Sequence, residues 1–158
     1  MIRRAGHIAC LAAYLEAPAR DGMLVEIQSS DPSVKSVAPF GGKRAVFTPN
    51  PIGIGIPTGA DPMLVDISTS ITTNGMSARL QAAGERFPGP WLLDKDGKPT
   101  DDPNVFDSDP QGTIQLLGGT DAGHKGYGLT LMVEAMTGGL AGYGRADGVE
   151  GWGATVMV

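Results

Sequence analysis

The sequence has little cysteine, little basic charge and no long apolar run. A single cysteine, Cys10, excludes an internal disulfide and fits a reducing cytoplasm, where we expect the protein to act. We interpret Cys10 as a small core residue rather than as a nucleophile. The formal net charge of −5 argues against nucleic-acid binding, which needs a clustered basic face. Because the sequence has no long apolar stretch, we expect no membrane span. Because it has no basic segment followed by a short apolar segment and a cleavage site, we expect no signal peptide.

Glycine, by contrast, is abundant. The chain has 24 glycines among 158 residues, about 15%, against a typical share of roughly 7%. They follow no fixed period, which excludes collagen and repeat architectures, so we interpret them as turns and close backbone approaches in a compact ligand-binding fold. The length is that of about one domain, and residues 1–158 are predicted to form a single domain.

The apolar pattern predicts helices and strands in alternation. The spacing of Ile8, Leu11 and Leu15 predicts a helix over residues 7–17 that ends at Pro18. A second, weakly patterned helix is expected over residues 72–83. Short apolar segments are expected to be strands over residues 23–27, 52–56, 63–67 and 152–158, and residues 91–93 are expected to be a short strand or a packing segment.

Two of the expected strands carry further information. Residues 52–56 alternate strictly between isoleucine and glycine, which predicts that the glycine face packs closely against another element. Asp66 lies near the end of the strand over residues 63–67, where open α/β folds place ligands. An equally supported reading makes Asp66 a cap for the helix that follows.

The stretch from Gly118 to Leu129 is the most distinctive in the chain. Its five glycines predict a loop that can approach a bound group closely, with a helix beginning within or just after it and running to about residue 140. A helix N-terminus together with Lys125 is a plausible site for a phosphate or a carboxylate. The alternative is an ordinary glycine-rich turn with a solvated lysine. The P-loop pattern does not fit, because it requires serine or threonine after its lysine and Gly126 follows Lys125. The dinucleotide-binding pattern does not fit either, because Gly126 and Gly128 are not followed by its third glycine.

A polar segment over residues 94–99 is predicted to be a hairpin turn or loop tip. It begins like a calcium-binding loop, but Val105 stands where the twelfth position requires an acid. We therefore expect no metal site there.

Six segments together resemble the malate/L-lactate dehydrogenase type 2 family. They occur in the family's order and cover nearly the whole chain, although each alone is a weak match. The matching segments are Arg4-Ala-Gly-His7-Ile8, Pro39-Phe-Gly-Gly42, Phe47-Thr-Pro-Asn-Pro51, Val65-Asp-Ile-Ser-Thr-Ser70, Asp94-Lys-Asp-Gly97 with Thr100 and Pro103, and Gly118-Gly-Thr with His124-Lys-Gly-Tyr-Gly128.

This resemblance implies a three-layer α/β fold with a mixed central sheet that binds NAD or NADP without a Rossmann domain. It implies hydride transfer between nicotinamide and a small 2-hydroxy acid, or the corresponding imine of a cyclic ketimine carboxylate. It also implies homodimers with the site near a subunit boundary. Members of the family continue beyond both ends of this sequence, so we expect a central portion that is incomplete at both ends, completed by missing segments or by a companion chain.

The resemblance also assigns roles to individual residues. His7 matches the histidine that transfers a proton, a role suited to a group that titrates near neutrality. The positions expected to touch the cofactor are Ser29, Ser30, Asp66, Ile67, Ser68, His124, Lys125 and Gly126. The sequence departs from the family pattern at Ser30, where asparagine is common, at Asp31, where some members have serine, and at Ala9, where glycine is usual.

Two other functions remain open from the sequence. The chain is either such an oxidoreductase or a truncated, catalytically inactive remnant that folds or dimerises and binds nucleotide weakly or not at all. A generic phosphate-binding α/β module is a third reading, and it rests on the glycine-rich stretch alone.

Overall fold

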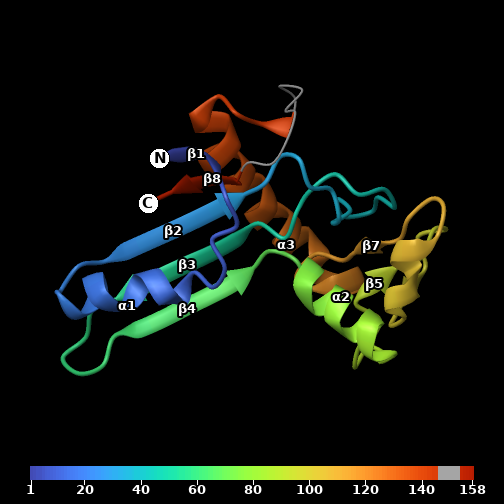
Figure 1. Cartoon of the computed structure of the whole chain (residues 1–158), viewed down its shortest axis with the longest axis horizontal. Coiled ribbons are helices and arrows are strands. Elements are labelled where there is room, and N and C mark those ends of the chain that lie inside the picture. Colours follow the sequence, from blue (N-terminus) through green and yellow to red (C-terminus); the bar gives the residue numbers. More distant parts are fainter. Residues whose placement is uncertain (146–153) are drawn as a thin grey trace. The chain divides into compact units, whose positions relative to one another are not determined.

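A computed structural model describes residues 1–145 and 154–158 and divides the chain into two compact units (Figure 1). Unit 1 consists of Met1–Ser33, Asn50–Ile67 and Leu131–Val158. Unit 2 consists of Val34–Pro49 and Ser68–Thr130. The expected single catalytic domain remains a prediction. Among the described residues, no helix is both long and apolar enough to cross a membrane.

Unit 1 is built on a five-stranded sheet with the strand order β1-β8-β2-β3-β4. The strands β1 and β8, β8 and β2, and β2 and β3 pair antiparallel, with Glu26 opposite Ile54 in the last pair. The bounds of the strands are Ile2–Ala5 for β1, Val25–Ser30 for β2, Pro51–Ile56 for β3, Met63–Ser68 for β4 and Ala154–Met157 for β8.

These bounds confirm most of the strands expected in unit 1. The strands over residues 52–56 and 63–67 are present, and β8 confirms the last strand from Ala154 on, whereas Trp152 lies outside the described residues. The second strand begins at Val25 and continues through Ser30, beyond the expected end at residue 27. It continues because Ser29 and Ser30 pair with β8, which the local sequence does not reveal.

Helix α1 (Ala12–Arg20) packs across β2 and β3, where the glycines of β3 make room for it. A Cβ on Gly53 would lie 2.9 Å from the Cβ of Leu11, and one on Gly55 would lie 2.9 Å from the backbone oxygen of Leu15. Leu11 and Leu15 are fully buried against Ile27. The predicted close packing of the glycine face is therefore confirmed.

The first helix differs from the expected one at both ends. It begins at Ala12 rather than at residue 7, because Ala9 has a φ of +56° and interrupts a right-handed helix. It continues through Pro18 to Arg20, and the backbone N–H of Asp21 still bonds to the oxygen of Ala17. Cys10, expected in the core, is instead exposed just before this helix, and its thiol donates to Oδ2 of Asp66 at 3.3 Å.

The opposite face of the same sheet is covered by the end of α3 (Gly119–Glu134) and by the π-helical turn η2 (Ala135–Gly139). Side chains alternate along β2, so Ile27 faces α1 whereas Ser30 faces Glu134. Unit 1 thus has a helix, a sheet and a helix in three layers. The α/β fold of the resembling family is confirmed, with antiparallel pairs in the sheet of unit 1.

Unit 2 contains a three-stranded sheet with the order β6-β5-β7 and antiparallel pairs. Helix α2 confirms the expected helix, starting from a bond of 3.2 Å from the N–H of Met76 to the Thr73 hydroxyl and ending at Gly84 with φ +67°. An isolated parallel bridge joins Val37 to Ile114 in its core. The bounds are Asn74–Ala83 for α2, Leu92–Leu93 for β5, Pro99–Thr100 for β6, Pro103–Asp107 for the 3₁₀ turn η1 and Thr113–Ile114 for β7.

The glycine-rich stretch is helical for most of its length. Helix α3 begins at Gly119, so Gly123, Gly126 and Gly128 are inside the helix rather than in a loop. Gly126 lets the helix approach a neighbouring segment, since a Cβ there would lie 2.5 Å from the backbone oxygen of Leu117. Close approach was the expected property of these glycines, but the neighbour of Gly126 is the protein's own backbone.

Candidate functional site

His7 lies on the exposed segment between β1 and α1 in unit 1. Its Nδ1 accepts a hydrogen bond of 3.1 Å from the backbone N–H of Ala9, which anchors the ring. In the neutral ring this bond puts the hydrogen on Nε2, which therefore is the donor. The local turn depends on the positive φ of Ala9, the position at which the resembling family has glycine.

Asp66, near the end of β4, caps the N-terminus of α1. Its Oδ2 accepts the backbone N–H of Ala12 at 2.9 Å and the thiol of Cys10 at 3.3 Å. No side chain of α1 itself caps this end, so the carboxylate satisfies a donor that would otherwise lack a partner in the helix. The expected capping role is real, but the capped helix precedes Asp66 in the chain instead of following it.

Ser29 and Ser30 form the end of β2, and both are buried. Figure 1 shows β2 and β4 running in the same direction, with β3 between them in the sheet. The last residues of β2 and Ile67 near the end of β4 therefore lie at the same end of the two strands. Ile67 is 42% exposed, whereas Ser30 is 2% exposed. At this end of the strands, Ile67 is therefore open to solvent and Ser30 is not.

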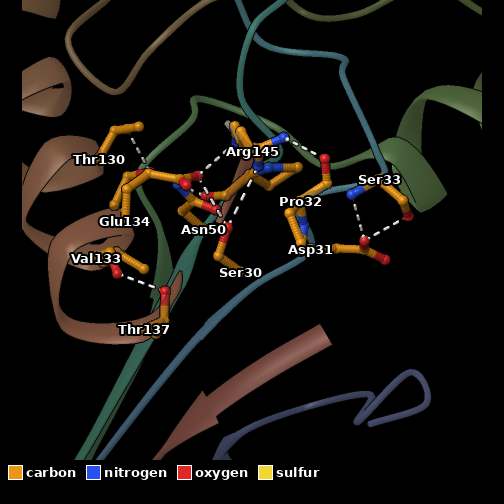
Figure 2. Close-up of polar contacts among 12 residues, drawn as sticks. Ser30, Asp31, Pro32, Ser33, Asn50, Thr130, Val133, Glu134, Thr137 and Arg145 are labelled. Carbon is orange, nitrogen blue, oxygen red and sulfur yellow. Dashed lines mark hydrogen bonds and ion pairs between the residues drawn. The ribbon is translucent and has the colours of Figure 1, made fainter. Parts of the chain in front are cut away.

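The Ser30 hydroxyl belongs to a polar network that the sequence did not reveal (Figure 2). It donates to Oε1 of Glu134 at 2.9 Å, and the same oxygen accepts Asn50 Nδ2 at 2.8 Å and Arg145 Nε at 2.9 Å. The one available signal was an acid at position 134 among the apolar residues of α3. Asn50 joins it from the segment just before β3 and Arg145 from a residue in 3₁₀ conformation after η2, and no local pattern predicts that.

The cofactor residues expected in unit 2 lie on α3 and at the end of β4. His124 and Lys125 are exposed, and the His124 ring contacts the Phe40 ring edge to face with centroids 5.8 Å apart. Gly126 is buried against Leu117 and Thr69. The Ser68 hydroxyl donates to the backbone oxygen of Ser70 at 2.8 Å. Lys125 therefore stands in the second turn of the helix and not at its N-terminus.

Phe40 also lines a cavity of about 340 Å³ within unit 2. Leu116 contributes an apolar wall, and Lys43 and Thr120 bring polar groups, the latter in the first turn of α3. A cation beside a helix N-terminus is suited to an anionic group. The charged residues that line this cavity are Lys43 and Asp96, and Lys125 does not line it. The anion site expected at Lys125 stays a prediction.

The predicted site residues are distributed over both units. Unit 1 holds His7, Ser29, Ser30, Asp66 and Ile67, and unit 2 holds Ser68, His124, Lys125 and Gly126. Their roles with a cofactor or a substrate stay predictions.

Known proteins of one family are similar to this chain. The model of the malate/L-lactate dehydrogenase family matches residues 1–157. A (2R)-3-sulfolactate dehydrogenase (NADP⁺) of Chromohalobacter salexigens is 39% identical over 86% of this chain and 38% of its own length. A Δ1-pyrroline-2-carboxylate reductase of Burkholderia multivorans is 38% identical over 98% of this chain and 44% of its own.

A solved structure gives the same result for the fold. The malate dehydrogenase of Entamoeba histolytica has a TM-score of 0.81 at 28% identity, covering 98% of this chain and 46% of that one. The chain therefore spans less than half the length of the relatives named here.

Proposed function

Because the chain belongs to the malate/L-lactate dehydrogenase family, we propose that it carries nicotinamide-dependent chemistry on a small 2-hydroxy acid or a cyclic ketimine carboxylate. The observation that carries the proposal is the family match over residues 1–157, which includes the exposed imidazole of His7. One relative is named for NADP⁺, and NAD or NADP is the cofactor class that we assign here. The cofactor, when bound, supplies or accepts the hydride.

His7 is the residue to which we assign proton transfer. Oxidation of a hydroxyl group releases a proton as the hydride leaves, and a histidine is suited to accept it near neutral pH. While Nδ1 accepts the N–H of Ala9, Nε2–H of the neutral ring is free to donate a hydrogen bond to a substrate oxygen or nitrogen. To accept a proton at Nε2 the ring must carry its hydrogen on Nδ1, and the bond to Ala9 must then open. Proton transfer by His7 is therefore coupled to its turn.

The charged and polar groups fit an anionic nucleotide. In unit 2, Lys43 and Thr120 at the start of α3 line one cavity together with Asp96, and the exposed Lys125 offers a second cation. In unit 1, Ile67 offers an exposed apolar side chain at the sheet edge. We assign cofactor contact to these groups and to the eight positions expected from the sequence, with Ser30 taking part through the end of β2 and not through its hydroxyl, which is bonded to Glu134 and Arg145.

We also propose a homodimer that acts in the cytoplasm on a free small molecule. The absence of a disulfide partner for Cys10 in the sequence supports a reducing compartment. The inactive remnant has no specific observation in its favour. The generic phosphate module rested on the glycine-rich stretch alone, and most of that stretch is helix rather than an open loop.

The test is an assay of the purified chain for NADH- or NADPH-dependent reduction of 2-oxo acids and cyclic imine carboxylates, with His7→Ala beside it. A chimaera in which residues 1–157 replace the matching part of the sulfolactate dehydrogenase supplies the rest of the architecture. We expect His7→Ala to lower turnover by about 10²- to 10⁴-fold while leaving nucleotide binding intact. Full turnover in His7→Ala would refute the role of His7, and a folded chimaera without any turnover would refute the proposed function.

A further inference from the structure

One carboxylate oxygen in unit 1 gathers three donors. Oε1 of Glu134, the last residue of α3, accepts hydrogen bonds from Ser30, Asn50 and Arg145 at 2.8 to 2.9 Å (Figure 2). Arg145 in turn donates from Nη2 to the Ser30 hydroxyl at 3.3 Å. The Ser30 hydroxyl thus donates a hydrogen bond to Glu134 and accepts a hydrogen bond from Arg145, the two members of one ion pair.

The ion pair is largely removed from water. The side chains of Glu134 and Arg145 are 17% and 12% exposed, whereas those of the ion-paired Glu16 and Arg20 on α1 are 53% and 51% exposed. Charges held away from solvent keep their geometry, since a displaced partner would leave the other charge poorly solvated. The Glu134–Arg145 pair therefore holds its geometry beside β2 more firmly than the exposed Glu16–Arg20 pair does on α1.

Arg145 extends this hold to the turn that follows β2. Its Nη1 donates to the backbone oxygen of Pro32 at 3.4 Å. Within the turn, Oδ1 of Asp31 accepts the N–H of Ser33 at 2.9 Å and its hydroxyl at 2.6 Å. The planar guanidinium reaches Glu134, Ser30 and Pro32 from separate nitrogen atoms, which a lysine cannot reproduce. The end of the strand and the start of the turn are held together by one side chain.

We propose that Glu134 and Arg145 are positioning residues for nicotinamide-nucleotide binding, acting through Ser30 and the turn of residues 31–33. This inference rests on the proposed function, which assigns cofactor contact to the end of β2. Because the Ser30 hydroxyl is engaged on both sides, its side chain serves the ion pair. The direct contact with the nucleotide comes from the segment that the pair holds in place. Neither Glu134 nor Arg145 touches the nucleotide.

The discriminating variant is Arg145→Lys, which keeps a positive charge beside Glu134 but loses the planar fork. Arg145→Leu and Glu134→Gln remove the charge of one partner, and Glu16→Gln breaks the exposed pair on α1 as a matched control. Hydrogen exchange of the free chain at the amides of Asp31 and Ser33 reports the turn. Titration with NADH and with NADPH, at a temperature well below the thermal unfolding midpoint of each variant, reports the nucleotide affinity.

We expect Arg145→Lys to speed exchange at Asp31 and Ser33 and to weaken binding of the preferred nucleotide by about tenfold or more. Exchange in α1 and α2 should stay as in the parent, and Glu16→Gln should match the parent throughout. A purely structural pair would instead make affinity follow global stability, so that Arg145→Lys, with its charge retained, binds nearly as well as the parent.

The outcomes separate this inference from the proposed function. Parent-like affinity in Arg145→Lys, with faster exchange in the turn, overturns the positioning role while nucleotide binding stands. If the folded parent binds neither NADH nor NADPH, both the proposed function and the positioning role are overturned. The exchange data then still show whether the pair orders the turn.

Discussion

Asp66 on β4 holds the first turn of α1 through a hydrogen bond of 2.9 Å from the backbone N–H of Ala12. The two residues are far apart in the sequence, and the helix has no capping side chain of its own. We expect Asp66→Ala to lower the free energy of unfolding by about 1 kcal/mol, the usual contribution of a helix cap. Urea unfolding measures this value.

Asp61→Ala is the control for that variant. Asp61 pairs with Arg20 on the same helix, but its side chain is 88% exposed, so its loss should cost less than Asp66→Ala. Equal losses in the two variants would show that the cap contributes nothing specific.

Gly126 distinguishes packing from cofactor contact. An added Cβ would lie 2.5 Å from the backbone oxygen of Leu117 and 2.9 Å from that of Thr69, so Gly126→Ala should destabilise the chain by about 1 to 3 kcal/mol. Gly128 has open space around it in the same helix, and Gly128→Ala should be neutral or stabilising by about 0.5 to 1 kcal/mol. Thermal unfolding compares the two. Undiminished stability in Gly126→Ala, with nucleotide binding lost, would favour the contact role alone.

Ala9 occupies a conformation that suits glycine. Its φ of +56° strains an L-residue by about 1 kcal/mol or more, part of which the greater freedom of glycine in the unfolded chain offsets. We therefore expect Ala9→Gly to stabilise the protein by roughly 0.5 kcal/mol while the backbone bond to His7 is retained. Ala13→Gly, inside α1, should instead destabilise it by about 1 kcal/mol. A loss in Ala9→Gly as large as in Ala13→Gly would contradict the strain at Ala9.

The turn between β5 and β6 depends on an ionised carboxylate. Backbone N–H groups of Lys98 and Asp96 bond to Oδ1 of Asp94 at 2.8 and 2.9 Å, and the bond from Lys98 is the main cause that lowers the pKa of Asp94 below its ordinary 3.8. The folded chain then holds the carboxylate ionised more readily than the unfolded chain does. This stabilisation is present above pH 3.8 and is lost as the pH falls through the lower folded pKa.

An NMR titration of the Asp94 carboxyl carbon checks the direction. We expect its midpoint to lie below 3.8, and we expect Asp94→Asn to remove part of the acid-side decrease in stability. A midpoint at or above the ordinary value would contradict the hydrogen bonds of the turn.

The features that the sequence predicted correctly depend on residues close to one another along the chain. Alternating glycines predicted the tight face of β3, and the pattern of residues 72–83 predicted α2. Ordered motifs predicted the family, which the match over residues 1–157 bears out. These features were accessible because each depends on a periodicity or on a run of motifs.

Other features depend on contacts between distant segments. The extension of β2 through Ser30 requires β8, and the start of α1 requires the turn at Ala9 and the carboxylate of Asp66. The ion pair of Glu134 and Arg145 joins segments that no local pattern connects to Ser30. Tertiary partners therefore decide these details, and propensity alone does not give them.

The proposed function depends on binding of a nicotinamide nucleotide by this chain. Its most direct measurement is a titration of the purified, folded chain with NADH and NADPH by calorimetry, with Lys125→Ala beside it and the exposed Lys95→Ala as control. We predict saturable binding of one nucleotide that Lys125→Ala weakens by about tenfold and Lys95→Ala leaves unchanged. Absence of saturable binding of either nucleotide would contradict the account.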